Sequence, residues 1–272
     1  MNPQEYRDLL APVSALVRSV RPMILEHAVG KITAKGDNDF VTATDYAVQK
    51  ILEEGLHAIR PDFAFLGEES ADHRLDLNVP TWVIDPIDGT TNFIHRYAFS
   101  CVSVGLVLGG DTLIGVVYNP YMDELFSAAR GFGATLNDRP ISVSEIDDFR
   151  YALVNIGTMA YHKNKTADAF RLWKRLFCAG SDIRRSGSAA LDLCYVAVGR
   201  TEMYAEPALC SWDFAAGAVI LREAGGKLTD WYGTPLVCDG KRHSVAASNG
   251  ILHDEFCRII AEEDVMSATE IE

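Results

Sequence analysis

The sequence predicts an α/β protein in which layers of helices and β-sheets alternate. Three observations indicate this class. Apolar residues recur at helical spacing near the N-terminus, several short strands follow in close succession, and strands alternate with helices after about residue 151. With 272 residues, 48% of them hydrophobic, the chain can bury a large core. We therefore expect an N-terminal α+β half of residues 1–150 and a C-terminal α/β half of residues 151–272.

The N-terminal half is predicted to begin with helices. Apolar side chains at helical spacing extend from residue 3 to about 29, with kinks or a break expected at Pro12 and Pro22. A second helix is expected from about Tyr46 to Ile59, since Pro61 follows it. Strands are expected near residues 63–66 and 82–84, followed by an antiparallel sheet of residues 99–108, 112–118, 124–129 and 134–136.

The C-terminal half is predicted to alternate between the two element types. Strands are expected at residues 152–156, near 183, at 202–205 and at 245–248. Helices are expected at residues 165–177, 189–198 and 212–223, with a closing helix after residue 248. The tail from Glu262 onward is polar and acidic, and we expect it to fray.

The most informative segment is residues 85–93, which read Asp-Pro-Ile-Asp-Gly-Thr-Thr-Asn-Phe. Asp85 follows the apolar run Trp82–Ile84, which has the character of a short buried strand, and Pro86 is expected to end strand pairing. Asp85 and Asp88 are close enough in the chain to share divalent cations, to which the Ile87 carbonyl can add a hard oxygen ligand.

The second part of this segment has the chemistry of a phosphate-binding turn. Gly89 has no Cβ, so the backbone can approach a ligand closely. A helix that begins at Gly89 or Thr90 would point its free amides at an anion. The alternative is an acidic turn that only caps a helix, because short motifs also occur by chance.

Acidic residues of three further segments lie at the ends of predicted strands and helices. Glu68 and Glu69 follow the predicted strand at 63–66, and their charges would repel those of the Asp85 segment unless a cation lay between them. Asp213 lies in the first turn of an apolar helix, where an acid also stabilises the helix terminus. Asp45 precedes another helix, and for it the capping role is the stronger interpretation. Together these acids suggest one shared site.

These residues occur in the order of the motifs of a known enzyme family. The matching segments are Lys35 with Val41–Asp45, Gly67–Ser70, Trp82–Phe93, Gly187–Ala190, and Glu206 with Trp212–Asp213. Over nearly its full length the chain resembles the inositol monophosphatase family of lithium-sensitive, magnesium-dependent phosphomonoesterases. The loop Gly36–Asp39 departs from that pattern by being shorter and more acidic, so a role for it in binding a third, weaker metal stays open.

The resemblance implies an αβαβα sandwich of the sugar phosphatase and inositol monophosphatase type, with the metal site between the two halves. It also implies a homodimer and two or three Mg²⁺ ions as cofactors. The implied ligands of the first ion are Glu68, Asp85 and the Ile87 carbonyl, and those of the second are Asp85, Asp88 and Asp213.

The resemblance assigns roles to the remaining motif residues. Glu68 and Thr90 position and activate the attacking water, and Asp45 accepts a hydrogen bond from the Thr90 hydroxyl. The amides of Gly89 and Thr90 hold the phosphate. The residues placed around the substrate hydroxyls are Asp88, Gly187, Ser188, Ala189 and Glu206. For Glu206 a solvated acid at a strand end is the alternative interpretation.

Composition indicates a soluble cytoplasmic enzyme. The longest strongly apolar run, Cys101–Leu108, is too short to span a bilayer, and the N-terminus has no pattern of a secretion signal. Six scattered cysteines are expected to be reduced, and seven histidines in no ligand pattern argue against zinc. A formal net charge of −13 repels nucleic acid and anionic membranes, so we expect neither as a partner.

Two other phosphatase mechanisms would require different residues of this chain. Cys178 and Arg184 have the C-x₅-R spacing of a phosphate loop with a cysteine nucleophile. Such a pair arises readily by chance, and we interpret Cys178 as the end of a helix and Arg184 as structural. An aspartyl-phosphate mechanism would need two aspartates separated by one residue, whereas Asp85 and Asp88 are separated by two.

Three functions therefore remain. The first is a Mg²⁺-dependent phosphatase acting on a small-molecule polyol phosphomonoester, above all myo-inositol 1-phosphate. The second is a bisphosphate-specific relative, either a 3′,5′-bisphosphate nucleotidase or a fructose-1,6-bisphosphatase. Thr91 and Asn92 favour the first, because nucleotide-specific relatives carry a lysine and an acid there. The third is a regulatory partner of the transcription machinery.

Overall fold

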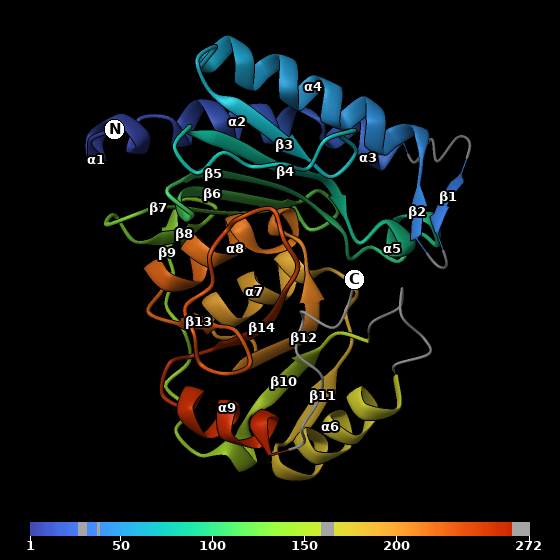
Figure 1. Cartoon of the computed structure of the whole chain (residues 1–272), viewed down its shortest axis with the longest axis vertical. Helices are drawn as coiled ribbons and strands as arrows, with labels where there is room; N and C mark the ends of the chain where they lie inside the picture. Colours follow the sequence, from blue (N-terminus) through green and yellow to red (C-terminus); the bar gives the residue numbers. More distant parts are fainter. Residues whose placement is uncertain (27–31, 37–38, 159–165, 263–272) are drawn as a thin grey trace.

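The computed structural model describes residues 1–26, 32–36, 39–158 and 166–262 and contains five layers (Figure 1). Helices α2 (Leu10–Ser19) and α4 (Ala43–Ile59) cover the outer face of a seven-stranded sheet. Helices α7 (Ala189–Ala197) and α8 (Ser211–Glu223) fill the space between that sheet and a five-stranded sheet. Helices α6 (Thr166–Ala179) and α9 (His253–Ala261) lie below the second sheet. This αβαβα arrangement confirms the predicted fold class.

The predicted N-terminal helix is divided into α1 (Pro3–Arg7), α2 and α3 (Arg21–Leu25). Pro22 lies in the first turn of α3, where the missing amide hydrogen is tolerated. The other break falls at Asp8–Leu9, before Pro12, which lies in the first turn of α2. Residues 27–29 of the predicted helix lie outside the described residues.

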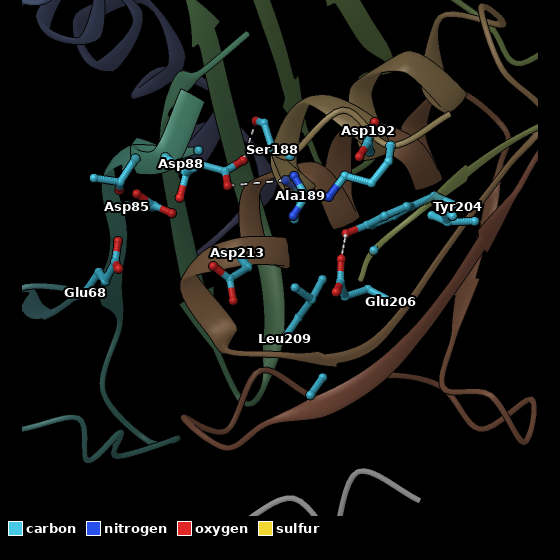
Figure 2. A pocket seen from close by; sticks show the side chains of 18 of the residues that line it. Glu68, Asp85, Asp88, Ser188, Ala189, Asp192, Tyr204, Glu206, Leu209 and Asp213 are labelled. Atoms are coloured by element: carbon cyan, nitrogen blue, oxygen red, sulfur yellow. Dashed lines mark hydrogen bonds between the residues drawn. The ribbon is translucent and has the colours of Figure 1, made fainter. Parts of the chain in front are cut away.

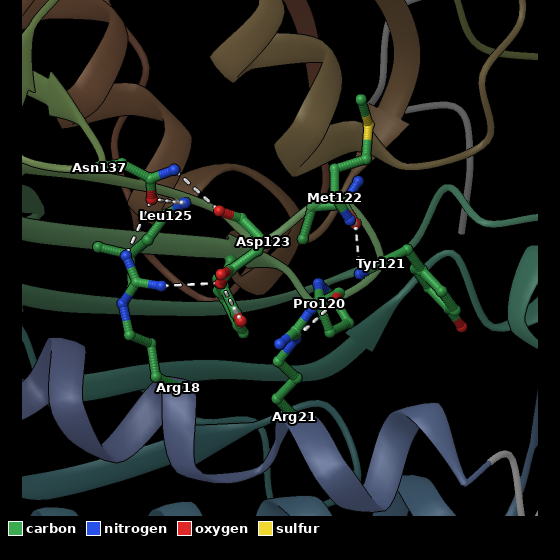
Figure 3. Close-up of polar contacts among 10 residues, drawn as sticks. Arg18, Arg21, Pro120, Tyr121, Met122, Asp123, Leu125 and Asn137 are labelled. Atoms are coloured by element: carbon green, nitrogen blue, oxygen red, sulfur yellow. Dashed lines mark hydrogen bonds and ion pairs between the residues drawn. The ribbon is translucent and has the colours of Figure 1, made fainter.

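Polar contacts attach these helices to the sheet (Figure 3). The Arg18 guanidinium donates from Nη1 to Asp123 Oδ1 at 2.9 Å and from Nη2 to Asn137 Oδ1 at 2.9 Å. Arg21 Nε donates to the Pro120 carbonyl at 2.9 Å. Both arginines therefore bind the turn that joins two neighbouring strands, and they fix the helical layer over the sheet.

The seven-stranded sheet runs in chain order from β3 to β9, with one parallel pair at its start. Its strands are β3 (Ala64–Gly67), β4 (Thr81–Asp88), β5 (Cys101–Leu108), β6 (Asp111–Asn119), β7 (Glu124–Ala129), β8 (Ala134–Leu136) and β9 (Arg139–Pro140). The expectation that Pro86 ends strand pairing is wrong. β4 continues to Asp88, and its register with β5 shifts between Asp85 and Asp88. Pro86 lies in this bulge, where a strand residue needs no paired amide.

The five-stranded sheet has the order β11-β10-β12-β14-β13. Its strands are β10 (Leu153–Ile156), β11 (Asp182–Arg184), β12 (Met203–Leu209), β13 (Lys227–Thr229) and β14 (His243–Ser248). β13 and β9 were not predicted, nor was the hairpin of β1 (Thr33–Gly36) and β2 (Asp39–Val41). Each large sheet takes its strands from one predicted half of the chain, and the division near residue 150 stays a prediction.

Helix α8 lies close to the seven-stranded sheet because glycines face it. A Cβ on Gly115 would lie 2.2 Å from the Ala216 carbonyl oxygen. A Cβ on Gly105 would lie 3.2 Å from the Cβ of Ala215. The helix is buried over most of its length, and this contact fixes its N-terminal turn beside the end of β4. Among the described residues, no helix combines the length and apolar character needed to cross a membrane.

Candidate active site

A pocket lies where the end of β4 meets the first turns of α7 and α8 and the strand β12 (Figure 2). The predicted residues that line it are Glu68, Asp85, Ile87, Asp88, Gly89, Thr90, Gly187, Ser188, Ala189, Glu206 and Asp213. The structure therefore brings together all predicted site residues except Asp45. Asp45 does not line the pocket, but it contacts Thr90, which does. Glu69 is not among the lining residues; its amide donates to Gln49 Oε1.

Strand pairing places Glu68 beside Asp85. β3 and β4 are parallel with Gly67 opposite Ile84, and the Glu68 amide donates to the Ile84 carbonyl at 3.0 Å. The next residue along β4 is Asp85, whose Oδ1 accepts from the Ile87 amide at 3.0 Å. Glu68, directly after β3, and Asp85, within β4, therefore line the same pocket.

Asp88 is held by the first turn of α7. Its Oδ2 accepts from the Ser188 hydroxyl at 2.6 Å and from the Ala190 amide at 2.7 Å, and its Oδ1 accepts from the Ala189 amide at 3.3 Å. An acid supplied by β4 therefore satisfies free amides at the N-terminus of a helix from the other half of the chain.

Asp213, which is half-buried, completes a cluster of three acids with the buried Asp85 and Asp88. It lies in the first turn of α8, where its Oδ2 accepts from the Cys210 amide at 2.7 Å. One carboxylate oxygen from each of Asp85, Asp88 and Asp213 lies within 4.8 Å of the others. Hard carboxylate oxygens at this separation can hold a divalent cation between them.

The charges in this cluster are unfavourable without a cation. Burial, followed by the charges of Glu68, Asp88 and Asp213, raises the pKa of Asp85 well above its usual range. Burial, followed by the charges of Asp88 and Glu68, also raises the pKa of Asp213 well above its usual range. Burial raises the pKa of Asp88 less, because Ser188 and the α7 amides stabilise its ionised form. Protons or a bound cation relieve this repulsion, so the donor set fits a metal ion.

Asp45 contacts both the start of α4 and Thr90. Its Oδ2 accepts from the Thr42 amide at 2.9 Å and caps α4, while its Oδ1 lies 3.4 Å from the Thr90 hydroxyl. That hydroxyl also lies 3.1 Å from the Ile87 carbonyl, so its single hydrogen has two alternative acceptors.

The predicted turn at Gly89 is present. Gly89 has φ +91° and precedes α5 (Thr90–Ile94), and a Cβ there would lie 2.9 Å from the Gly187 carbonyl. Both the backbone conformation and this close approach require glycine. Asn92, in α5, strengthens the same junction, because its Nδ2 donates to the carbonyls of Phe99 and Ser186 at 2.7 and 2.8 Å.

Glu206 lies on the side of the pocket away from Glu68 (Figure 2). Its Oε2 accepts from the Tyr204 hydroxyl at 3.0 Å. A Cβ on Gly157 would lie only 1.4 Å from that same oxygen, so the carboxylate occupies space that only glycine leaves open. The alternative of a freely solvated acid at a strand end is therefore wrong for Glu206, which is half-buried in the pocket wall.

Three polar lining residues were missed by the sequence analysis, namely Asp192, Tyr204 and Arg242, and Arg185 also lines the pocket. Tyr204 and Glu206 are two residues apart on β12 and share a face, so strand periodicity could have identified Tyr204. Asp192 lies one turn into α7, where its Oδ2 accepts from the Ser186 hydroxyl at 2.5 Å. No local signal marks Arg242, which only the pairing of β12 with β14 brings to the pocket.

The rival cysteine mechanism finds no support in the geometry. Cys178 is exposed near the end of α6, and Arg184 forms an ion pair with Asp182; neither lines the pocket. All six cysteines lie in the described part of the chain, and none is in a disulfide. For the proposed third-metal loop, Asp37 and Asn38 lie outside the described residues.

Comparisons with known proteins agree with this geometry. The sequence model of the inositol monophosphatase family matches residues 6–264. An inositol-1-monophosphatase of Synechocystis sp. is 43% identical over 86% of this chain and 81% of its own, and a Nus factor SuhB of Xylella fastidiosa is 36% identical over 81% and 78%. The structure of an inositol monophosphatase from Anabaena superposes with a TM-score of 0.85 at 35% identity, covering 98% of this chain and 99% of that one. The chain therefore belongs to the inositol monophosphatase family.

Proposed function

We propose that this phosphoric monoester hydrolase uses Mg²⁺ to release phosphate from a polyol phosphomonoester, with myo-inositol 1-phosphate as its substrate. The observation that carries the proposal is the cluster of Asp85, Asp88 and Asp213 next to the Gly89 turn. Phosphoryl transfer needs positive charge on the phosphoryl oxygens, and this cluster can hold that charge beside a turn that suits a phosphate.

The acidic residues would hold two Mg²⁺ ions with two sets of ligands that share Asp85. Glu68, Asp85 and the Ile87 carbonyl would hold the first Mg²⁺, and Asp85, Asp88 and Asp213 would hold the second. A third ion would depend on the loop Gly36–Asp39. When bound, Mg²⁺ supplies positive charge to the phosphoryl oxygens and makes a water molecule more acidic.

The proton path uses side chains that already lie together. In this step the Thr90 hydroxyl would donate to Asp45, because the Ile87 carbonyl, its other acceptor, would be a ligand of the first Mg²⁺. The Thr90 oxygen is then an acceptor for the attacking water. Glu68 would take a proton from that water as the water oxygen bonds to phosphorus and the ester P–O bond breaks. The departing alcohol oxygen would take a proton from solvent water. The amides of Gly89 and Thr90 at the start of α5 bind the phosphate oxygens during this step.

Polyol hydroxyls would bind on the opposite wall. Glu206 would accept a hydrogen bond from a substrate hydroxyl there. Ser188 already donates its hydrogen to Asp88, so toward the substrate its oxygen acts as an acceptor. Gly187, Ala189 and Asp88 complete the wall.

A homodimer is part of the proposal. Met122 is 54% exposed, and its Sδ accepts a hydrogen bond from the Tyr195 hydroxyl at 3.6 Å. The Phe99 ring packs edge-on against the Tyr195 ring, with 5.3 Å between the ring centroids. This apolar patch of Phe99, Met122 and Tyr195 would be covered by a second copy. Light scattering should give twice the chain mass, and Met122→Glu should shift the protein toward a monomer; a wild-type monomer would contradict the proposal.

The relative named a Nus factor favours one second candidate, a regulatory role in transcription. The cysteines without disulfides agree with the predicted cytoplasmic location that such a role needs. Binding of the purified protein to RNA polymerase would support this role, and it would not exclude catalysis.

The decisive experiment is a turnover screen with and without Mg²⁺. Inositol 1-phosphate, fructose 1,6-bisphosphate and adenosine 3′,5′-bisphosphate should be compared at equal concentration. We expect Mg²⁺-dependent phosphate release, with the highest kcat/KM for inositol 1-phosphate. A large preference for the sugar or nucleotide bisphosphate would replace the proposed substrate, and turnover in excess chelator would contradict the metal mechanism.

A further inference from the structure

Glu68 and Asp213 come from distant segments of the chain, and both line the same pocket (Figure 2). Glu68 directly follows β3, and Asp213 lies in the first turn of α8. Two ionised acids repel each other, so contacts elsewhere must hold their segments together before a cation binds. A side chain that joins these segments would therefore affect the metal site even from outside the pocket.

His73 contacts both segments. Its Nε2 lies 3.2 Å from the Glu68 carbonyl oxygen, and the ring nitrogen is the donor because a carbonyl only accepts. The His73 ring also packs against the Trp212 ring, with 4.6 Å between the centroids and 51° between the planes. Trp212 is buried and directly precedes Asp213. One side chain thus bridges the two segments that carry the acids.

The backbone of Glu68 is held from two directions. Its amide donates to the Ile84 carbonyl at 3.0 Å, which attaches it to β4, while its carbonyl accepts from His73. Because the direction of a side chain depends on its backbone, these two hydrogen bonds limit where the Glu68 carboxylate can lie.

The loop that carries His73 is itself attached beside α8. A Cβ on Gly240 would lie 2.8 Å from the His73 carbonyl oxygen, so the two backbones are in close contact. The Gly240 amide donates to Ser211 Oγ at 3.0 Å, and Ser211 is the first residue of α8. His73 is exposed and is not among the residues that line the pocket, so its position suits support of the site and not contact with a substrate.

We propose that His73 is a positioning residue of the metal site, because it fixes the Glu68 segment and the Asp213 turn relative to each other. When the two acids are already correctly spaced, less free energy is needed to assemble the ligands, so Mg²⁺ binds more tightly. This inference rests on the proposed metal-dependent function and adds to it a residue that touches neither the metal nor the substrate. Loss of His73 should weaken Mg²⁺ binding and leave the chemistry at saturating Mg²⁺ unchanged.

Three variants separate the two contacts of His73. His73→Ala removes both contacts, His73→Phe keeps a ring beside Trp212 without a donor, and His73→Gln keeps a donor without a ring. Arg74→Ala is the matched control, because Arg74 is the next residue of the same exposed loop and forms an ion pair with Asp72. Each protein is titrated with Mg²⁺ in two ways, by its Tm and by its initial rate of p-nitrophenyl phosphate hydrolysis.

We expect the half-saturating Mg²⁺ concentration to rise about tenfold in His73→Ala and about threefold in each of His73→Phe and His73→Gln. The rise of Tm with Mg²⁺ should move to higher concentrations by similar factors. At saturating Mg²⁺, kcat and KM should stay within about twofold of the wild type, as for most surface substitutions. Arg74→Ala should match the wild type in both titrations.

Several results would overturn the positioning role. One is an unchanged Mg²⁺ midpoint in His73→Ala, and another is an equal rise in Arg74→Ala. A lower Tm in excess chelator with an unchanged Mg²⁺ midpoint would mean that His73 only stabilises its loop. If only one of His73→Phe and His73→Gln shifted the midpoint, His73 would act on one segment and would not join the two.

Failure of the proposed function would look different. The wild type itself would then show neither a rise in Tm with Mg²⁺ nor Mg²⁺-dependent turnover, and the positioning role would be refuted together with the metal site. If the wild type shows both effects and His73→Ala matches it, only the positioning role is refuted.

Discussion

The Ser188 hydroxyl donates a 2.6 Å hydrogen bond to the Asp88 carboxylate, which joins the two halves of the chain at the proposed metal site. Asp88 is thus both a proposed metal ligand and the acceptor for the first turn of α7. A change in either half that moves this contact would move the metal ligand and the substrate wall together. Residues that fix a metal ligand in this way contribute to metal affinity although they do not touch the ion.

Ser188→Ala tests this relationship. The variant removes one donor from Asp88 and leaves the α7 amides in place, so we expect the half-saturating Mg²⁺ concentration for turnover to rise about tenfold. Ser127→Ala is a matched control, because Ser127 is also buried and hydrogen-bonded, to Thr135 at 3.0 Å in the outer part of the sheet. Mg²⁺ titration of the initial rate measures both, and an unchanged midpoint in Ser188→Ala would contradict the positioning role.

Local sequence predicted the acidic cluster better than it predicted the pocket wall. Asp85 and Asp88 are three residues apart, and the parallel pairing of two predicted strands was enough to bring Glu68 to them. Arg242 depends on the pairing of β12 with β14, distant segments whose register no local pattern encodes. Pro86 was misjudged because proline disfavours regular pairing, whereas here it lies in a bulge that aims Asp85 and Asp88 at one site.

Asp213→Asn tests the second proposed ion. The change removes a charged oxygen ligand with little change in shape, so activity at limiting Mg²⁺ should fall by at least about a hundredfold, with partial recovery at high Mg²⁺. Asp88→Asn should behave similarly. Turnover close to that of the wild type at limiting Mg²⁺ in both variants would refute the ligand assignment.

Metal-free protein should lose stability as the pH rises. The pKa values of Asp85 and Asp213 are raised in the folded state by burial and mutual repulsion, so the folded protein binds more protons than the unfolded chain above about pH 4. The free energy of unfolding therefore falls with increasing pH until the folded-state pKa values are passed. Mg²⁺ replaces these protons, so it should raise Tm more at pH 8 than at pH 5.5.

Calorimetry with Mg²⁺ and with excess chelator at both pH values measures this difference. Groups far from the site contribute equally with and without Mg²⁺, so the difference isolates the acidic cluster. In Asp213→Asn, the rise in Tm that Mg²⁺ causes should differ less between pH 5.5 and pH 8 than in the wild type. A Mg²⁺-induced rise in Tm that is larger at pH 5.5 than at pH 8 would contradict this account of the acidic cluster.

Cys178→Ser separates water attack from attack by a thiolate. Cys178 is exposed on α6 and does not line the pocket, so we expect kcat/KM to stay within about twofold of the wild type, as for most surface substitutions. Steady-state assays and mass spectrometry of the protein quenched during turnover check this. A phosphorylated cysteine, or loss of activity with an unchanged Tm, would restore the cysteine mechanism.

The contact between Gly157 and Glu206 provides the sharpest test of substrate recognition. A methyl group on Gly157 would overlap Glu206 Oε2, at 1.4 Å, and displace the carboxylate from the pocket wall. Gly157→Ala should therefore reduce kcat/KM for inositol 1-phosphate about as much as Glu206→Gln, roughly ten- to hundredfold, because a charge-assisted hydrogen bond is lost. Turnover of p-nitrophenyl phosphate, which has no polyol hydroxyls, should change far less.

The losses of activity caused by the Gly157 and Glu206 substitutions should not be additive. In a Glu206→Ala background no carboxylate remains to be displaced, so adding Gly157→Ala should cost little further activity, and the double-mutant cycle should show a coupling close to the whole effect of the single change. Additive losses would mean that Gly157→Ala acts on the fold and not through Glu206. Equal losses on both substrates in Glu206→Gln would mean that this carboxylate supports the site in general and does not recognise the polyol.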